Sequence, residues 1–220
     1  MLNVLWATGR SYFVDWESSW IQELLGDIPY RIQDVTRMDT IAQNALIVAN
    51  HNIPYVQYLA QYESLKIPFG LIHLSDEYLT DDVRPYDFSM CKFVFRNCLR
   101  PSVDSHPKVR QFALGYKYGF WDDAPSLRDH AKCVKGMSRL YAWSFAGGMR
   151  DNRREALSCF QNAIQQHKVV IEAGNSFNDP QTGLSTKDYR DLMIQSKFVL
   201  CPVGNVSVDC FRIYEALECG

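Results

Sequence analysis

Short apolar runs alternate with longer amphipathic stretches through the first half of the chain. The runs have the length of buried strands and fall at residues 3–7, 45–49, 69–74, 92–95 and 109–115. Residues 12–25 and 54–65 instead repeat aromatic and leucine side chains at helical spacing, and we expect these side chains in the core. Strands that alternate with helices predict a parallel sheet with crossover helices.

Residues 121–137 are polar and irregular, which predicts a linker. We therefore expect an N-terminal domain of residues 1–128 and a C-terminal domain of residues 129–220. Beyond the linker, the pattern predicts strands at 140–146, 168–173 and 197–201, and helices at 152–165, after Ser185 and from Asp209. The predicted fold class is α/β, with two Rossmann-like domains.

The composition narrows the classes of function. The 220 residues are 47% hydrophobic and 13% aromatic, which is enough for large cores. A formal net charge of -2 and an isoelectric point near 6.2 argue against a nucleic-acid partner, because such proteins carry a basic surface. No apolar run reaches the roughly 18 residues that a membrane helix needs, so the sequence predicts no membrane segment in this chain.

The most informative stretch is the C-terminal end of the chain. An apolar strand leads into Pro202 and Gly204, and a loop of small polar residues then reaches Asp209, a predicted helix N-cap. A strand, a glycine loop and a helix N-terminus form the anion site of many α/β folds. On the helix, Arg212 and Glu215 share a face, where a guanidinium can bind a diphosphate and a carboxylate can accept from ribose hydroxyls. The alternative is a salt bridge between these two side chains on a surface helix.

This stretch resembles the donor-site motif of the exostosin family of glycosyltransferases, an apolar strand followed by P-x-G, D-S-x-R and E-A-L-x-x-G. The matching positions are Pro202, Gly204, Asp209, Arg212, Glu215, Ala216, Leu217 and Gly220. Cys210 stands where the family has serine, which removes a hydroxyl group from this position. The resemblance implies that a nucleotide-sugar donor binds at these residues.

A second segment, residues 139–157, resembles the opening strand of the donor domain in the same family. Gly147 and Gly148 permit a close backbone approach, and Arg150 or Arg153 can point a charge at the diphosphate from a second side. The alternative is a plain strand-to-helix turn whose helix carries a solvated basic face at Arg153 and Arg154.

Three segments of the first half, residues 71–78, 92–99 and 112–120, resemble the acceptor domain of exostosin-like transferases, including the ribitol xylosyltransferase branch. Each places polar residues directly after an apolar strand, at the edge where α/β sheets bind ligands. The resulting candidates for a cleft are His73, Asp76, Glu77, Arg96, Asn97 and Lys117.

An inverting transfer needs a base for the proton of the acceptor hydroxyl, and we assign this role to Asp76 or Glu77. The alternative for the pair is a helix N-cap with an acid in the first turn. His51 is a further cleft candidate, with a structural histidine as its alternative. No Asp-x-Asp triplet occurs, so we predict no metal, and arginines with a helix dipole would neutralise the diphosphate instead.

The resemblance implies two Rossmann-like domains that face each other across a cleft, the GT-B arrangement, with the second domain truncated at its C-terminal end. The implied enzyme is an exostosin-like glycosyltransferase that moves a hexose or pentose from a nucleotide-diphosphate sugar to a glycan or glycoconjugate hydroxyl, with inversion. We expect no cofactor beyond the nucleotide-sugar donor, which is a substrate, and a glycan acceptor as the other partner.

Two other classes of protein stay open. A non-catalytic nucleotide- or glycan-binding module would use the same anion site. A dinucleotide-dependent oxidoreductase is disfavoured, because no G-x-G-x-x-G follows any early strand. The expected compartment is the cytoplasm if residue 1 is the native start, and the Golgi lumen if the chain is a fragment of an anchored eukaryotic protein.

Overall fold

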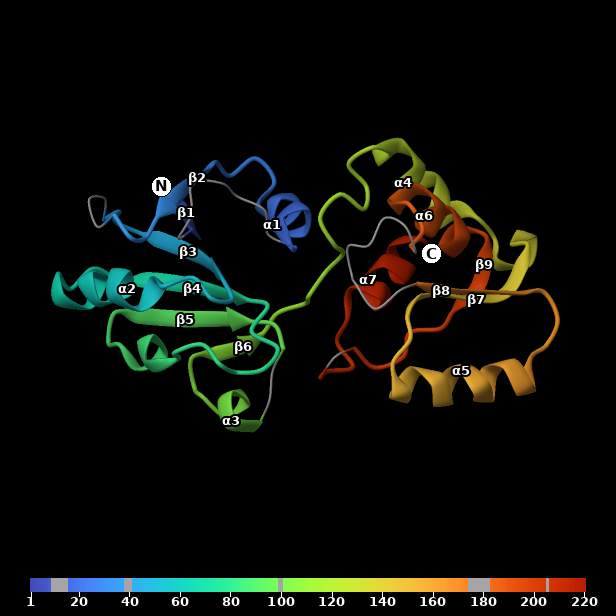
Figure 1. Ribbon diagram of the computed structural model, residues 1–220. Coiled ribbons are helices and arrows are strands. Elements are labelled where there is room, and N and C mark those ends of the chain that lie inside the picture. Colours follow the sequence, from blue (N-terminus) through green and yellow to red (C-terminus); the bar gives the residue numbers. More distant parts are fainter. Residues whose placement is uncertain (9–15, 38–40, 99–100, 174–182, 205) are drawn as a thin grey trace. The chain divides into compact units, whose positions relative to one another are not determined.

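The chain forms two compact units, Met1–Leu114 and Gly115–Gly220 (Figure 1). The computed structural model describes residues 1–220 except 9–15, 38–40, 99–100, 174–182 and 205. Each unit has its own parallel sheet with helices, which confirms the predicted α/β class. The predicted domain boundary after residue 128 stays a prediction, and residues 115–128 lie in the second unit. Within the described ranges, no helix has the length and apolar character needed to cross a membrane.

The sheet of the first unit has six parallel strands in the order β2-β1-β3-β4-β5-β6. The strands are β1 (Asn3–Thr8), β2 (Tyr30–Asp34), β3 (Ala45–Asn50), β4 (Phe69–Leu74), β5 (Cys91–Arg96) and β6 (Val109–Gln111). The helices are α1 (Ser18–Leu25), α2 (Tyr55–Ser64) and α3 (Pro101–Asp104), with the 3-10 turn η1 (Arg84–Asp87). The central strands β3 and β4 are buried along almost their whole length, as their continuous apolar sequences predict.

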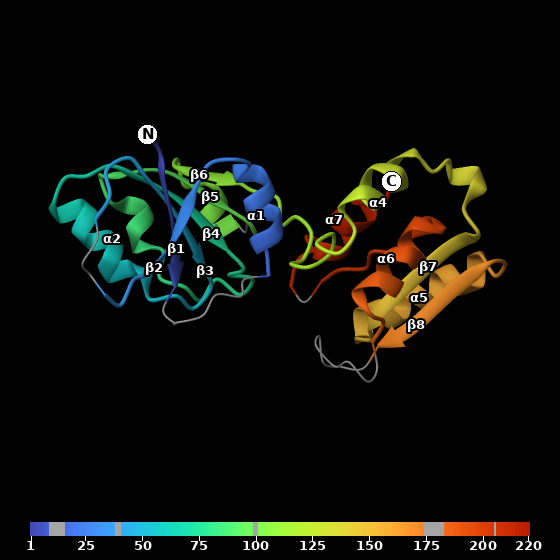
Figure 2. The ribbon, with the colours of Figure 1, turned by 90° about the horizontal axis from the view of Figure 1, so that it is seen from above.

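Both faces of this sheet are covered, because alternate residues of a strand point to opposite faces. Leu5 belongs to the core cluster on the α2 face, where Tyr58 and Tyr62 are fully buried. Its neighbour Trp6 belongs to the cluster on the α1 face, together with Ile21 (Figure 2). The aromatic stripe of α2 therefore serves the core, as predicted.

Two elements of the first unit differ from the sequence prediction. Strand β2 was not predicted, because its sequence YRIQD has no apolar run and its first three residues are exposed at the sheet edge. Strand β6 is shorter than the predicted run of residues 109–115, because it pairs with β5 only as far as Gln111. The predicted helix start at residues 12–15 lies outside the described residues, and α1 begins at Ser18.

The second unit has a parallel sheet in the order β8-β7-β9, with α5 on one face and α6 on the other (Figure 1). The strands are β7 (Tyr141–Gly148), β8 (Lys168–Ala173) and β9 (Ser196–Val199). The helices are α4 (Pro125–Cys133), α5 (Asp151–Ala163), α6 (Thr186–Ile194) and α7 (Phe211–Glu218), with the 3-10 turn η2 (Gly136–Ser138). Trp143 and Phe145 of β7 are fully buried and form the core with Leu157 of α5.

Residues 121–137 were predicted to be a linker, and this prediction was wrong. They contain the helix α4, which Pro125 begins, since proline is favoured in the first turn of a helix. Its sequence is polar because only Ala131 is buried, while Arg128 forms an ion pair with Glu218 of α7. Polar helices of this kind give little apolar periodicity to detect.

The strand predicted at residues 197–201 is parallel but not buried. Phe198 is 69% exposed, because β9 pairs only with β7 among the described strands and forms one edge of the sheet. The helix predicted from Asp209 begins two residues later, with Cys210 at the N-cap. The side chain of Asp209 instead accepts a hydrogen bond from the hydroxyl of Tyr214 at 2.7 Å.

Replacement of Leu59 by alanine should test the packing of α2. Leu59 is fully buried on the sheet, so the Leu59→Ala variant should lose about 2–5 kcal/mol of unfolding free energy. The exposed neighbour Gln57 provides a control, and Gln57→Ala should change this free energy by less than about 0.5 kcal/mol. Urea unfolding followed by circular dichroism measures both, and equal stabilities of the two variants would contradict the assignment of α2 to the core.

Candidate functional site

Polar residues gather at the carboxyl edge of the first sheet, where β3, β4 and β5 end side by side. This edge is where α/β sheets bind their ligands. A non-glycine residue with left-handed backbone follows each strand, with φ of 66° at Asn52, 61° at Ser75 and 55° at Cys98. Such backbone costs energy and is common at functional sites. The sheet therefore presents a pre-formed polar edge.

A buried ion pair between Arg96 and Asp76 lies at this edge. Their charged atoms are 2.8 Å apart, and each side chain is only 1% exposed. Arg96 also donates to the backbone oxygen of Asp76 at 3.0 Å and to the hydroxyl of Tyr86 at 2.8 Å. The other carboxylate oxygen of Asp76 accepts from the backbone N–H of Thr80 at 2.8 Å.

These contacts bear on both roles considered for Asp76. No helix follows it in this described stretch, because residues 77 and 78 form a turn, so the helix N-cap alternative is wrong. Arg96 binds one oxygen of the Asp76 carboxylate, and the backbone N–H of Thr80 donates to the other. The predicted role of Asp76 or Glu77 as the base stays a prediction, and Glu77 is partly exposed beside this pair.

His73 is fully buried at the end of β4 and is held by hydrogen bonds on both ring nitrogens. Nδ1 lies 3.0 Å from the guanidinium of Arg96, which can only donate, so this nitrogen accepts. Nε2 lies 2.9 Å from Asp81 and therefore carries the proton. Burial and the charge of Arg96 lower the pKa of His73, against the opposing effect of Asp81, so the ring is neutral. His73 is thus a buried structural residue that connects Arg96 to Asp81.

His51 occupies a different environment from His73. Its Nδ1 lies 2.9 Å from Asp81 and 3.6 Å from Asp76, and its side chain is 26% exposed. Its backbone N–H donates to the carbonyl of Leu74 at 2.9 Å, which fixes the residue at the end of the sheet. Of the two histidines at this edge, His51 is the accessible one.

A second polar network was not predicted from the sequence. Glu17 is fully buried and accepts from Asn97 at 3.2 Å, from Asn50 at 3.3 Å and from the hydroxyl of Ser75. The backbone N–H of Ser75 donates to Asn97 at 2.9 Å, so Asn97, a predicted cleft residue, is part of the buried framework. Glu17 is 80 residues from Asn97 in the sequence, and no local pattern connects them.

His51, Asp76 and Asp81 could offer ligand atoms to a metal ion, since one atom from each lies within 4.8 Å of the others. The carboxylate oxygens nearest His51 already accept from backbone N–H groups, Asp76 from Thr80 and Asp81 from Asn52 at 3.2 Å. The guanidinium of Arg96 also neutralises one carboxylate. These contacts account for the cluster without a cation, and the prediction of a metal-free site stays a prediction.

In the second unit, the guanidinium of Arg212 lies at the carboxyl end of β7. It donates to the carbonyl of Ala146 at 3.0 Å and stacks over the ring of Phe145, 5.0 Å from its centroid. A Cβ atom at Gly147 would lie 2.3 Å from the guanidinium, so a larger residue here would displace the end of the Arg212 side chain. Among the described residues, Arg212 forms no ion pair with Glu215, and its buried Nε has no partner. The predicted alternative of a surface salt bridge is therefore wrong.

Arg153 and Arg150 add positive charge near Arg212. Arg153 donates to the carbonyl of Gly148 at 2.8 Å and to that of Val203 at 3.3 Å, so it joins the glycine turn to the loop after β9. Burial lowers the pKa of Arg153, and the charges of Arg212 and Arg150 lower it further. Arg153 is thus not on a simple solvated face, whereas Arg150 is exposed.

The loop that precedes α7 is compact around Gly204. The N–H of Gly204 donates to the carbonyl of Ser207 at 2.8 Å, and a Cβ atom would lie 3.0 Å from that oxygen. Pro202 and Gly204 are both buried. Burial raises the pKa of Asp209, although the hydrogen bond from Tyr214 partly opposes this effect. The described part of the loop is therefore compact, and its predicted role in donor binding stays a prediction.

Glu215 and Lys117 meet in the second unit. Glu215 is 4% exposed and accepts from the backbone N–H of Lys117 at 3.3 Å and from the hydroxyl of Tyr189 at 3.1 Å. Burial raises the pKa of Glu215, and these hydrogen bonds and nearby positive charges only partly oppose it. Lys117 was predicted beside the first-half candidates, and it instead belongs to the unit that contains Glu215.

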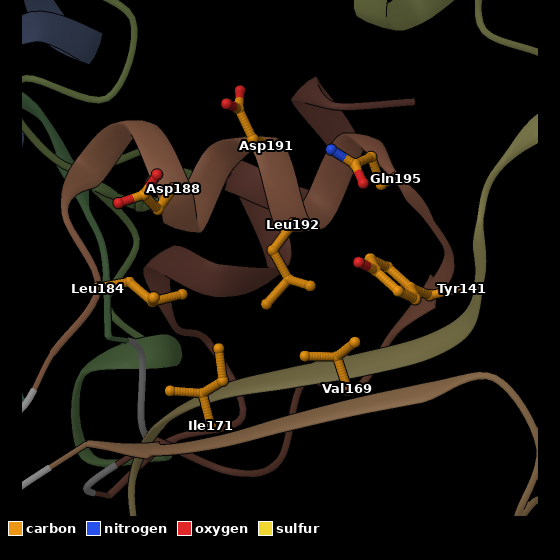
Figure 3. Close-up of a pocket in the computed structure, with 8 residues that line it drawn as sticks. All are labelled: Tyr141, Val169, Ile171, Leu184, Asp188, Asp191, Leu192 and Gln195. Carbon is orange, nitrogen blue, oxygen red and sulfur yellow. The ribbon is translucent and has the colours of Figure 1, made fainter.

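Another hollow in the second unit has a different character. A groove of about 310 Å³ lies between α6 and the sheet. Figure 3 shows Val169 and Ile171 on the sheet side of this groove, and Asp188 and Asp191 on the helix. None of the described residues that line it is an arginine or a lysine. An anionic ligand therefore fits the arginines at the carboxyl end of β7 better than this groove.

Comparison with known proteins finds similarity over part of this chain. Residues 123–220 match the RXYLT1 C-terminal domain. Two curated relatives, both glycosyltransferases by name, are ribitol-5-phosphate xylosyltransferase 1 of Homo sapiens, 36% identical, and of Mus musculus, 34% identical, each over 84 residues. The predicted resemblance to the ribitol xylosyltransferase branch is thereby confirmed. The matches cover 37% of this chain and 19% of each relative. No solved structure shows a significant match.

The ion pair at the first edge can be tested against an exposed pair in the same unit. Arg96→Met leaves Asp76 buried and uncompensated, so the unfolding free energy should fall by about 3–5 kcal/mol. Arg84 pairs with Asp82 but is 78% exposed, so Arg84→Met should lower the unfolding free energy far less than Arg96→Met does. Urea denaturation measures both values, and an Arg96→Met variant as stable as Arg84→Met would contradict a structural role for the buried pair.

Proposed function

We propose that this chain is part of an exostosin-like glycosyltransferase that moves a sugar from a nucleotide-diphosphate donor to a glycan or glycoconjugate hydroxyl. A pentose is the favoured sugar and a ribitol phosphate unit the favoured acceptor, because the matched relatives are named ribitol-5-phosphate xylosyltransferases. The relatives support the class, and the second unit supplies a physical reason for donor binding.

The observation that carries the proposal is the guanidinium of Arg212. It is partly buried, has no carboxylate partner among the described residues and keeps a buried Nε–H without a partner. A buried charged donor without a partner is costly, and a bound diphosphate would relieve this cost through charge-assisted hydrogen bonds. Gly147 lets this guanidinium lie against the backbone at the end of β7, because a Cβ atom there would lie 2.3 Å from it.

Further groups at the end of β7 support the same ligand. Arg153 and Arg150 supply charge from a second side, and helix α7 begins at Phe211, where its partial positive charge favours an anion. Pro202, Gly204 and Asp209 shape the loop between them. The predicted hydrogen bonds from ribose hydroxyls to Glu215 stay a prediction. Both carboxylate oxygens of Glu215 already accept hydrogen bonds within the protein, from Lys117 and Tyr189.

The wider arrangement follows from this assignment. The second unit would bind the donor and the first unit the acceptor, as in the GT-B architecture, with inversion at the transferred carbon. Arginines would neutralise the leaving diphosphate without a metal ion or other cofactor. The acceptor would bind at the polar edge of the first sheet, with His51, His73, Arg96, Asn97 and Asp76 or Glu77. A non-catalytic nucleotide- or glycan-binding module is the alternative, and release of labelled sugar from a sugar nucleotide by the full-length protein distinguishes the two.

Donor binding can be tested at Arg212. Arg212→Ala should weaken UDP or GDP binding roughly tenfold to a hundredfold, because it removes a charge-assisted contact of about 1.5–3 kcal/mol. Arg212→Lys should restore only part of the affinity, since lysine lacks the planar fork. Calorimetric titration of the full chain measures these affinities.

The exposed Arg154 lies on the same helix as Arg153 and provides the control. Arg154→Ala removes the same charge from the chain and should leave the affinity within about twofold of the wild type. Equal affinities of the wild type and a folded Arg212→Ala variant would remove the donor-site assignment.

A further inference from the structure

Asp81 bridges the two histidines at the carboxyl edge of the first sheet. One of its carboxylate oxygens accepts from His73 at 2.9 Å, and the other lies 2.9 Å from Nδ1 of His51. The backbone N–H of Asn52 donates to this second oxygen at 3.2 Å. His51 and His73 therefore both contact the carboxylate of Asp81.

This geometry fixes where the proton of His51 lies. Although burial raises the pKa of Asp81, the hydrogen bond and charge of His73, the N–H of Asn52 and His51 lower it below its usual value. Asp81 is thus a carboxylate, which only accepts hydrogen bonds. Neutral His51 must carry its proton on Nδ1, and its lone pair is then on Nε2.

The Nε2 atom of His51 is the free end of this arrangement. It has no hydrogen-bond partner among the described residues, and it is absent from the buried polar atoms without partners, so it faces solvent. The side chain is 26% exposed, whereas that of His73 is fully buried and that of Asp76 is 1% exposed. Of these groups, His51 is the one that can receive a proton from outside.

We propose that His51 is the general base of the transfer reaction and that Asp81 is the residue that positions it. This inference rests on the proposed glycosyltransferase function. An imidazole with a carboxylate on Nδ1 and an open Nε2 is the arrangement that accepts a proton from a hydroxyl. Asp76 then serves the edge through Arg96, and its carboxylate need not leave that ion pair.

The chemical step balances without a further reactant. The acceptor hydroxyl gives its proton to Nε2 of His51 as its oxygen forms a bond to C1 of the sugar. The bond between C1 and the diphosphate oxygen breaks, and its electron pair leaves with the nucleoside diphosphate. Asp81 stabilises the imidazolium until the proton passes to solvent.

The test compares His51→Gln with His106→Gln in the full-length protein. His106 is a second partly exposed histidine hydrogen-bonded to an aspartate, Asp87, and it lies outside the proposed site. With a UDP-pentose donor and a ribitol 5-phosphate acceptor, His51→Gln should lower kcat on the order of a hundredfold or more. UDP affinity should stay unchanged, and His106→Gln should transfer at the wild-type rate.

Failure of the two proposals would look different. If the wild type transfers sugar and His51→Gln retains its rate, the base assignment is wrong and the transferase remains. If the wild type neither binds UDP nor transfers sugar, the proposed function itself is lost.

A spectroscopic measurement tests the positioning role of Asp81. Long-range nitrogen–proton spectra of ring-labelled histidine should show neutral His51 protonated on Nδ1 in the wild type, and this preference should weaken in Asp81→Asn. Protonation on Nε2 in the wild type would overturn the assignment. Stoichiometric binding of Zn²⁺ that His51→Gln abolishes would also overturn it, because the ring would then be a metal ligand.

Discussion

The buried ion pair between Arg96 and Asp76 organises the first unit at the edge of its sheet. It joins the end of β5 to the loop after β4, and Asp76 in turn holds the backbone of Thr80. That loop carries Asp81, which orients His73 on one side and His51 on the other. A buried pair contributes little net stability by itself, but loss of one partner leaves an uncompensated charge. The ion pair therefore fixes the loop whose Asp81 orients His73 and His51.

The second unit also contains a guanidinium, that of Arg212, in a different environment from that of Arg96. Arg212 has an aromatic ring and one carbonyl oxygen around it but no acid among the described residues, and Arg153 lies near enough to raise the local positive potential. The guanidinium of Arg96 thus has a carboxylate partner in the first unit, whereas that of Arg212 has none among the described residues. This difference supports an anionic donor in the second unit and a proton-transfer site in the first, and it agrees with the glycosyltransferase class of the matched relatives.

The local sequence predicted most strands and helices, because apolar runs and helical spacing report burial directly. It failed where burial is slight, as in β2 and the polar helix α4, and where pairing decides exposure, as at Phe198. Motif spacing brought Gly147 and Arg212 to attention separately, and only the structure shows that they touch. The sequence did not predict Glu17, because its partner Asn97 is distant along the chain. It did not predict Asp81, because an aspartate in a polar loop looks like an ordinary turn residue.

The central claim is that the guanidinium of Arg212 is held open for a diphosphate. The most direct measurement is the side-chain Nε–H resonance of Arg212 in nitrogen–proton spectra while UDP is added. The account predicts a large, saturable shift of this resonance. The Nε–H of Arg139, which is also buried without a partner but whose guanidinium is bound to backbone carbonyl oxygens, should not move. An unchanged Arg212 resonance at saturating UDP would contradict the account.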